Sequence, residues 1–137
     1  MNMKQLSVFL NDRPGELANF IELLMENKIF IRALTVAQTS EYGLLLLLVD
    51  KLEKCLALLE EKKYTHSTTD VIAVKLNGHP KALYEIPKSL GDNDVNIDYC
   101  YSTLVKEDPM LILRVANDDI KKATQTLVKS RFTIFET

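Results

Sequence analysis

The chain repeats itself, and this repeat restricts its fold more than any other feature of the sequence. Identical residues recur 66 positions apart: Leu10, Asn11, Pro14, Leu17, Leu24, Asn27 and Ile31 match Leu76, Asn77, Pro80, Leu83, Leu90, Asn93 and Ile97. Further along, the spacing becomes 68 positions, which aligns Asp50 with Asp118 and Leu59 with Leu127. A second hairpin that is two residues longer than the first would produce this change. The sequence is therefore read as an internal duplication.

The first half predicts the order strand, helix, strand, strand, helix, strand. Strands are expected at 5–10, 29–39 and 44–49, the third covered on both faces because it is continuously apolar, and residues 64–69 form a short polar strand or a link. A turn is expected at 40–43. Apolar residues at helical spacing mark two helices, with Asp50 as N-cap of the second: Leu17, Phe20, Ile21, Leu24 and Met25, then Leu52, Cys55, Leu56 and Leu59.

The second half predicts the same order. Strands are expected at 70–76, 95–103, 110–116 and 132–135, with a loop at 77–82 and a turn at 104–108. Asp118 is expected to introduce the last helix. The helical positions are Leu83, Ile86 and Leu90, then Ile120, Ala123, Thr124 and Leu127.

The predicted fold class is α+β, with a ferredoxin-like βαββαβ unit occurring twice and helices on one face of each antiparallel sheet. The predicted domains are 1–69 and 70–137. Because about 68 residues is near the lower limit for an independent core, the two units are expected to pack on each other. The same packing between two copies of the chain predicts a homodimer.

Composition excludes several classes of function. The formal net charge of −2 and the pI near 5.7 argue against binding to nucleic acid, which needs a basic face. The apolar run at 44–49 is too short to span a membrane, and the N-terminus leads directly into a strand pattern, so a cytoplasmic protein is expected. Cys55 and Cys100 lie in apolar patterns and are expected in the core.

The loop at 11–17 joins the first strand to the first helix. Pro14 suits a first helical turn, and Gly15 lets a ligand or another backbone come close. The N–H groups of Gly15, Glu16 and Leu17, together with the helix dipole, suit a carboxylate. The alternative interpretation is an ordinary helix start, which is the more common meaning of an isolated Pro-Gly turn.

This loop resembles the Asn-x-x-Pro-Gly-x-Leu motif of the ACT domain, a small regulatory module that generally binds amino acids. Residues 11–17 match the motif throughout, and residues 77–83 match it except at Lys81, where the family usually has glycine. Val95, Asn96 and Ile97 resemble the family's entry into its second strand. The resemblance covers the whole chain and implies a stand-alone tandem ACT protein that binds an amino acid.

The resemblance also implies a site where two domains meet. It would pair Asn96 and Ile97 with the first loop: Asn11, Asp12, Arg13, Pro14, Gly15, Glu16 and Leu17. Asn11 or Asn96 would accept a hydrogen bond from an α-ammonium group, with Asp12 adding negative charge, and Arg13 would hold a carboxylate bidentately. Alternatively, Asp12 and Arg13 form only a solvated turn.

The reciprocal site would pair Phe30 and Ile31 with the second loop, where the candidate residues are Asn77, His79, Lys81 and Leu83. This site is expected to be degenerate, because Lys81 has a side chain where close approach is wanted and Phe30 stands in place of Asn96. Pro87 is expected to kink the following helix.

Catalytic residues are scarce in the sequence. His66 and His79 are the only histidines, and no metal-binding or cofactor-binding motif occurs, so neither a metal nor a cofactor is predicted. The leading hypothesis is an amino-acid sensor, and the second is a regulatory subunit of a separate amino-acid biosynthetic enzyme such as an acetolactate synthase. A small enzyme that uses His79 or Cys100 is the third and is not favoured.

Overall fold

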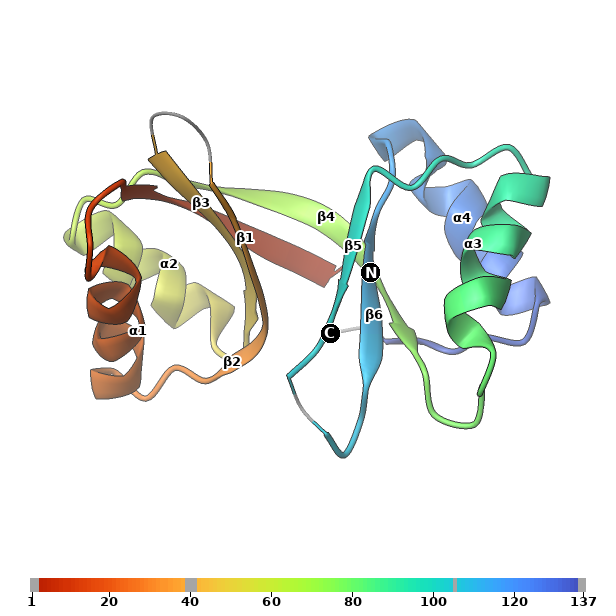
Figure 1. The fold of residues 1–137 in the computed structure, drawn as a ribbon, viewed down its shortest axis with the longest axis horizontal. Helices are drawn as coiled ribbons and strands as arrows, with labels where there is room; N and C mark the ends of the chain where they lie inside the picture. Colours follow the sequence, from red (N-terminus) through yellow and green to blue (C-terminus); the bar gives the residue numbers. More distant parts are fainter. Residues whose placement is uncertain (1–2, 39–41, 105, 136–137) are drawn as a thin grey trace. The chain divides into compact units, whose positions relative to one another are not determined.

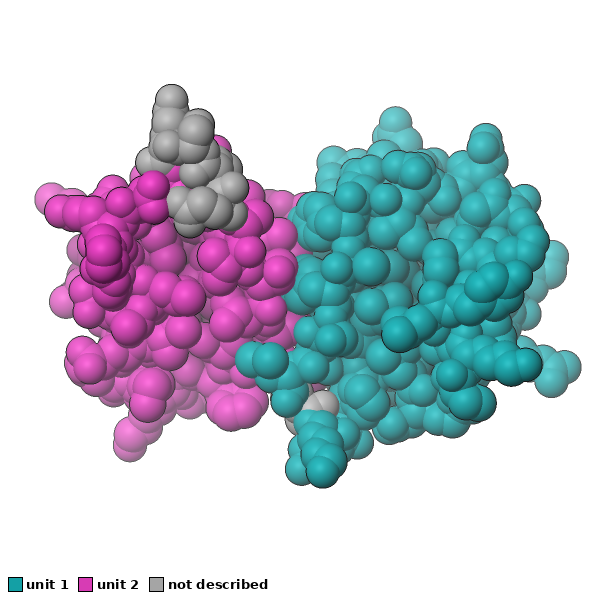
Figure 2. Space-filling model, in the orientation of Figure 1, with its two compact units in different colours: residues 1–4, 70–137 teal, residues 5–69 magenta. Residues whose placement is uncertain are grey.

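The computed structural model describes residues 3–38, 42–104 and 106–135, which form seven strands, four α-helices and one 3-10 turn (Figure 1). The chain divides into two compact units, residues 5–69 and residues 1–4 with 70–137 (Figure 2). Below, these are the first unit and the second unit. Strand β4 (His66–Lys75) crosses the boundary between them. The sequence suggested a short polar strand or link at 64–69 before a new strand, whereas the structure continues one strand from His66 to Lys75, a segment that contains neither glycine nor proline.

The first unit has strand order β2-β3-β1-β4. Its strands are β1 (Met3–Asn11), β2 (Ile31–Gln38), β3 (Tyr42–Val49) and the start of β4; its helices are α1 (Glu16–Glu26) and α2 (Leu52–Glu61). Both helices cover one face of the sheet (Figure 1). Tyr42 and Gly43 belong to β3 rather than to the predicted turn, and the remainder of that turn and Thr39 lie outside the described residues.

The second unit has strand order β7-β4-β6-β5. After β4 come α3 (Ala82–Asp92), β5 (Tyr99–Ser102), β6 (Met110–Arg114), the 3-10 turn η1 (Asn117–Asp119), α4 (Ile120–Lys129) and β7 (Ile134–Phe135). Again both helices cover one face (Figure 1). The two units therefore confirm the predicted α+β, ferredoxin-like fold. The strand predicted at 95–103 is shorter, because residues 95–98 pair only through the Asp98 N–H, 2.8 Å from the Arg114 carbonyl.

Each unit has its own hydrophobic core. In the first unit Phe20 and Leu24 are buried on α1, Leu45 to Leu48 are four consecutive buried residues of β3, and Cys55 and Leu59 are buried on α2. Leu45 and Leu47 belong to this core, whereas Leu46 and Leu48 lie on the other face of β3. The second core takes its residues from β4, α3, β6, α4 and the segments beside them: Ile72, Val74, Ile86, Leu90, Val95, Leu111, Leu113, Ala123 and Leu127 are among them.

Several predicted core positions are wrong. Met25 is 71% exposed, and so is Leu83, whose expected place on the buried face of α3 is taken by Ala82. Both residues lie one position from a buried residue, where helical spacing alone does not fix the edge of the apolar stripe. Cys100 is exposed, because β5 is an edge strand whose side chains alternate between exposed and partly buried.

All four helices end in the same way. The residue after each C-cap has a left-handed backbone, with φ between 57° and 72°: Lys28, Lys63, Asp94 and Arg131. The next residue donates its N–H back into the helix: Ile29 to Leu24, Tyr64 to Leu59, Val95 to Leu90 and Phe132 to Leu127, at 2.9 to 3.0 Å. This is the Schellman arrangement. Lys28 and Asp94, like Lys63 and Arg131, are repeat partners, so the duplication extends to the backbone.

The helix starts differ from those predicted. The N-cap of α2 is Lys51, while the Asp50 carboxylate accepts a hydrogen bond from the Phe30 N–H at 2.9 Å. Asp50 therefore fixes the entry into β2 instead of capping a helix. Asp118 lies within η1, and no side chain caps the start of α4. Helix α3 runs from Ala82 to Asp92 with Pro87 inside it, and the predicted kink stays a prediction.

Candidate functional site

The first loop begins helix α1 through a left-handed glycine. Gly15 has φ 89° and ψ −9° at the N-cap position, a conformation that residues with a Cβ rarely adopt. A Cβ placed on Gly15 would meet nothing within 4 Å. Glycine is thus required by backbone conformation, and the space beside it is open. The turn is closed by the Arg13 N–H, 2.9 Å from the Asn11 carbonyl.

Not all of the N–H groups predicted to hold a carboxylate are available. The Glu16 N–H is directed to the Arg13 carbonyl, at 3.3 Å, and the Gly15 carbonyl accepts from the Asn19 N–H at 2.9 Å. The helix start is therefore partly satisfied by its own loop. A carboxylate at this loop would depend more on side chains than the sequence suggested.

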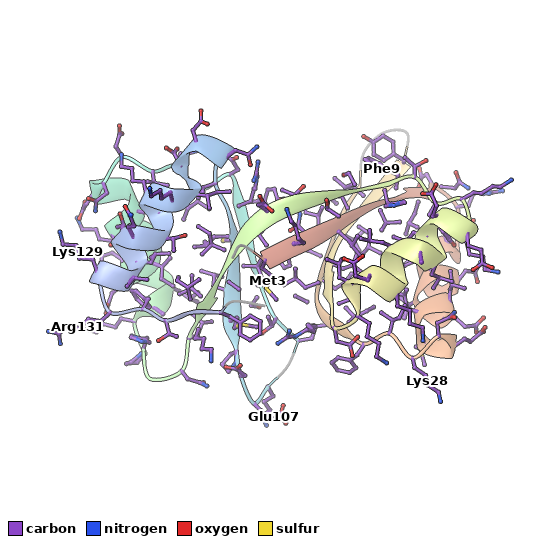
Figure 3. The ribbon with its side chains drawn as sticks, turned by 180° about the vertical axis from the view of Figure 1, so that it is seen from behind. Met3, Phe9, Lys28, Glu107, Lys129 and Arg131 are labelled. Carbon is purple, nitrogen blue, oxygen red and sulfur yellow. The ribbon has the colours of Figure 1, made fainter. Side chains whose placement is uncertain are left out.

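A cavity of about 320 Å³ lies beside this loop and brings predicted and unpredicted residues together. Asn11, Arg13 and Glu16 were predicted from the motif. The other lining residues were not, and they come from β1 and from the segment between α2 and β4: Phe9, Lys62, Lys63, Tyr64 and Thr65. The side chains of Figure 3 include Phe9, near the end of β1.

Strand order explains why the two lysines lie beside the motif. In the first unit β4 neighbours β1, and the Phe9 N–H donates to the Thr65 carbonyl at 3.0 Å. The segment that enters β4 therefore lies next to the end of β1, where the loop begins. The predicted topology contained this information, since a ferredoxin-like unit always places its fourth strand beside its first. Applying it to Lys62 and Lys63 would have identified them.

The cavity is positively charged overall. Arg13, Lys62 and Lys63 face one carboxylate, Glu16, whose Oε1 lies 3.5 Å from Arg13 Nη2. The Arg13 side chain is 69% exposed, so this ion pair contributes little to stability. Within the described residues, neither lysine pairs its ammonium group with a carboxylate. The arrangement suits a ligand that has one anionic group, bound by the lysines, and one cationic group, bound by Glu16.

The second loop has a different backbone. Its left-handed residue is Gly78, with φ 78°, whereas Lys81, the repeat partner of Gly15, has φ −107°. The His79 ring lies 4.6 Å from the Phe132 ring and is partly buried, which places it against the core of its own unit. Asn77 and Lys81 are exposed. The two loops therefore share a motif but not a conformation.

The residues predicted to face the loops lie at the starts of the second strands. Asn96 is exposed, with its Nδ2 3.5 Å from Asp98 Oδ1, and Ile97 packs partly against the second core. Phe30 is 60% exposed. The first loop and Asn96 belong to different units, and their pairing stays a prediction.

Groups suited to catalysis remain isolated. Burial raises the pKa of the Cys55 thiol to about 11, so it stays protonated. His66 Nδ1 lies 2.8 Å from the Tyr64 carbonyl. Among the described residues, no group of three or more His, Cys, Asp or Glu side chains is arranged to hold a metal ion. None of the helices described is both long and apolar enough to cross a membrane.

The chain thus consists of two ferredoxin-like units, each with a Pro-containing loop between its first strand and first helix. The family described as an ACT domain pair matches residues 1–136, and the chain belongs to this family. Among curated proteins, none matches the sequence.

Solved structures agree on the fold. A protein from Bacteroides thetaiotaomicron is 27% identical, with a TM-score of 0.86 over 98% of this chain and 92% of that one. The ligand-free regulatory subunit of aspartate kinase from Thermus thermophilus is 14% identical, with a TM-score of 0.64 over 94% and 93%. The corresponding subunit from Thermus flavus is 14% identical, with a TM-score of 0.61 over 94% and 92%. At 14% identity these two likenesses concern the fold alone.

Proposed function

We propose that this protein is a regulatory sensor that binds an amino acid at the first loop, residues 11–17. The observation that carries the proposal is the cavity beside the loop, where three cationic side chains and one carboxylate converge. Lys62, Lys63 and Arg13 provide donors for the α-carboxylate, and Glu16 with Asn11 provides acceptors for the α-ammonium. The volume of about 320 Å³ lies at the small end of the range for ligand sites, which suits a single amino acid.

Asn96 and Ile97 complete the site in this proposal, as they would in the arrangement that the family resemblance implies. The second loop contributes a weaker site or none, since Lys81 is not in the left-handed conformation of Gly15. The proposed domains are 1–69 and 70–137, each carrying one of the two loops.

The experiment is titration calorimetry of the purified protein against the twenty amino acids, followed by two matched variants. Lys63→Gly removes a cation from the cavity and also relieves a left-handed lysine, so it stabilises the fold by about 1 kcal/mol while weakening binding about tenfold. Lys28→Gly relieves the same backbone conformation at the end of α1, outside the cavity. It stabilises the fold equally and leaves binding unchanged. Lys28 extends from the end of α1 (Figure 3).

Two results would contradict the proposal. The first is that none of the amino acids binds. The second is that Lys63→Gly and Lys28→Gly bind the amino acid with the same affinity, whether that affinity is unchanged or lowered. Equal affinity would mean that the cavity residue Lys63 does not contact the ligand.

A partner protein is the second candidate, in which the chain regulates a separate amino-acid biosynthetic enzyme. Two neighbouring side chains at the start of α3 favour it, because Leu83 is 71% and Tyr84 is 65% exposed. This pair of side chains could instead join two copies of the chain. Light scattering tests this by comparing the molar mass of the unmodified protein with that of the Leu83→Ser, Tyr84→Ser double variant. Co-purification of an enzyme that is lost with both substitutions would support a separate partner, and co-purification of nothing beyond the chain itself would count against it.

A further inference from the structure

A larger cavity lies in the second unit, away from both motif loops. Its volume is about 460 Å³, which is within the usual range for small-molecule sites. One wall is the sheet, through Ile72 of β4 and Ile134 and Phe135 of β7. The other wall is formed by residues of the first half of α4: Ile120, Lys121, Thr124 and Gln125. Met3, which is labelled in Figure 3, adds a buried apolar group at the start of β1.

The walls of the cavity come from neighbouring elements of the second unit. β7 pairs with β4 at Ala73 and Val74, and helix α4 lies against β7. The residues just before this pairing, Asp70 to Ile72, line the cavity together with Ile134 and Phe135 of β7.

Charge in the cavity is distributed unevenly. The carboxylate of Asp70 is paired with the ammonium of Lys4. Arg114 Nη1 donates hydrogen bonds to the Asp70 carbonyl at 2.9 Å and to Asn117 Oδ1 at 3.0 Å. These two oxygen atoms therefore each have a donor. Lys121, one turn into α4, is the remaining charged residue of the lining. Within the described residues its ammonium group has no carboxylate partner.

We propose that this cavity, between α4 and the sheet of the second unit, binds a small carboxylic acid with an apolar body. The carboxylate is held by Lys121, with the hydroxyl of Thr124 and the amide of Gln125 available as further donors. The apolar body lies against Ile72, Ile134 and Phe135, where its burial contributes about 25 cal/mol per Å². Asp118 and Asp119 precede α4 but do not line the cavity. The ion pair with Lys4 weakens the repulsion between Asp70 and an anion.

The test uses two probes that share an apolar body and differ in the head group: 4-methylpentanoate and 3-methylbutylamine. Titration calorimetry with the full chain is expected to show binding of the acid and none of the amine. Lys121→Gln is expected to weaken binding of the acid about tenfold, the loss of one charge-assisted hydrogen bond. Lys122→Gln removes the same charge from the next, exposed position, which does not line the cavity, and is expected to change nothing.

A second variant tests the cavity itself. Thr124 is half-buried and lines the cavity, so Thr124→Phe fills the space and is expected to abolish binding of the acid while the circular dichroism spectrum is retained. Lys63→Gly, at the first loop, is expected to leave binding of the acid unchanged. The proposal is overturned if the acid does not bind, if the amine binds equally, or if Lys121→Gln retains full affinity. It is also overturned if Lys63→Gly abolishes binding, which would assign the acid to the first loop.

Discussion

Replacing Gly15 by alanine isolates the conformational requirement of the first loop. Gly15 has φ 89° and ψ −9°, and a Cβ there would meet nothing within 4 Å. The substitution therefore causes no steric clash, and its whole cost comes from holding an L-residue in the left-handed region, about 1–2 kcal/mol. For a chain of 137 residues that corresponds to a fall in Tm of about 3–7 °C.

The assay is urea unfolding followed by circular dichroism, with Gly91→Ala as the matched control. Gly91 lies inside α3, its φ is not positive, and its Cβ would also meet nothing within 4 Å. Alanine there should stabilise the protein by about 0.5–1 kcal/mol, because glycine inside a helix is unfavourable. The two substitutions add the same methyl group and should have opposite signs. If Gly15→Ala leaves the unfolding midpoint unchanged or raises it, the left-handed start of α1 is wrong.

Three further predictions concern other elements. Asp50→Ala should destabilise the protein by about 1 kcal/mol because the Phe30 N–H loses its acceptor, whereas Asp118→Ala, which removes no capping bond, should have little effect in the same urea assay. Pro87→Ala should raise the Tm, because alanine restores an N–H for the Leu83 carbonyl inside α3; an unchanged or lower Tm would contradict this. Cys100 should react with a thiol reagent at pH 8 in the folded protein and Cys55 should not, as mass spectrometry would show. Folding raises the pKa of the Cys55 thiol to about 11. The contribution of the buried thiol to the free energy of unfolding should therefore be complete below the thiol's ordinary pKa and should fall as the pH rises toward 11.

The repeat was sufficient to predict the fold, because it showed the order of elements twice. The differences between the predicted and the observed elements are limited to a few residues at the ends of helices and strands. Asp50 and Asp118 have the residue type of an N-cap, but composition does not show whether a carboxylate meets its own helix or a neighbouring strand. The sequence also did not distinguish Ala82 from Leu83 as the buried residue of α3, since both fit a helical stripe.

The candidate site was predictable in part. The motif identified Asn11, Arg13 and Glu16, because the conformation of a turn depends on residues that are neighbours in the sequence. Lys62 and Lys63 come from a segment about 50 residues away, and only the pairing of β1 with β4 brings them to the loop. The cavity beneath α4 had no sequence signal of its own. Its lining comes from residues far apart in the chain, such as Ile72, Lys121 and Phe135, which only the fold brings together.

The most direct test of the central claim is an amide NMR spectrum of the labelled protein, recorded with and without the amino acid that binds most tightly. The largest shift changes are expected at Arg13, Glu16 and residues 62–65, which line the first-loop cavity. Amides of the second loop should shift less. Changes confined to other parts of the chain, or an unchanged spectrum with every amino acid tried, would contradict it.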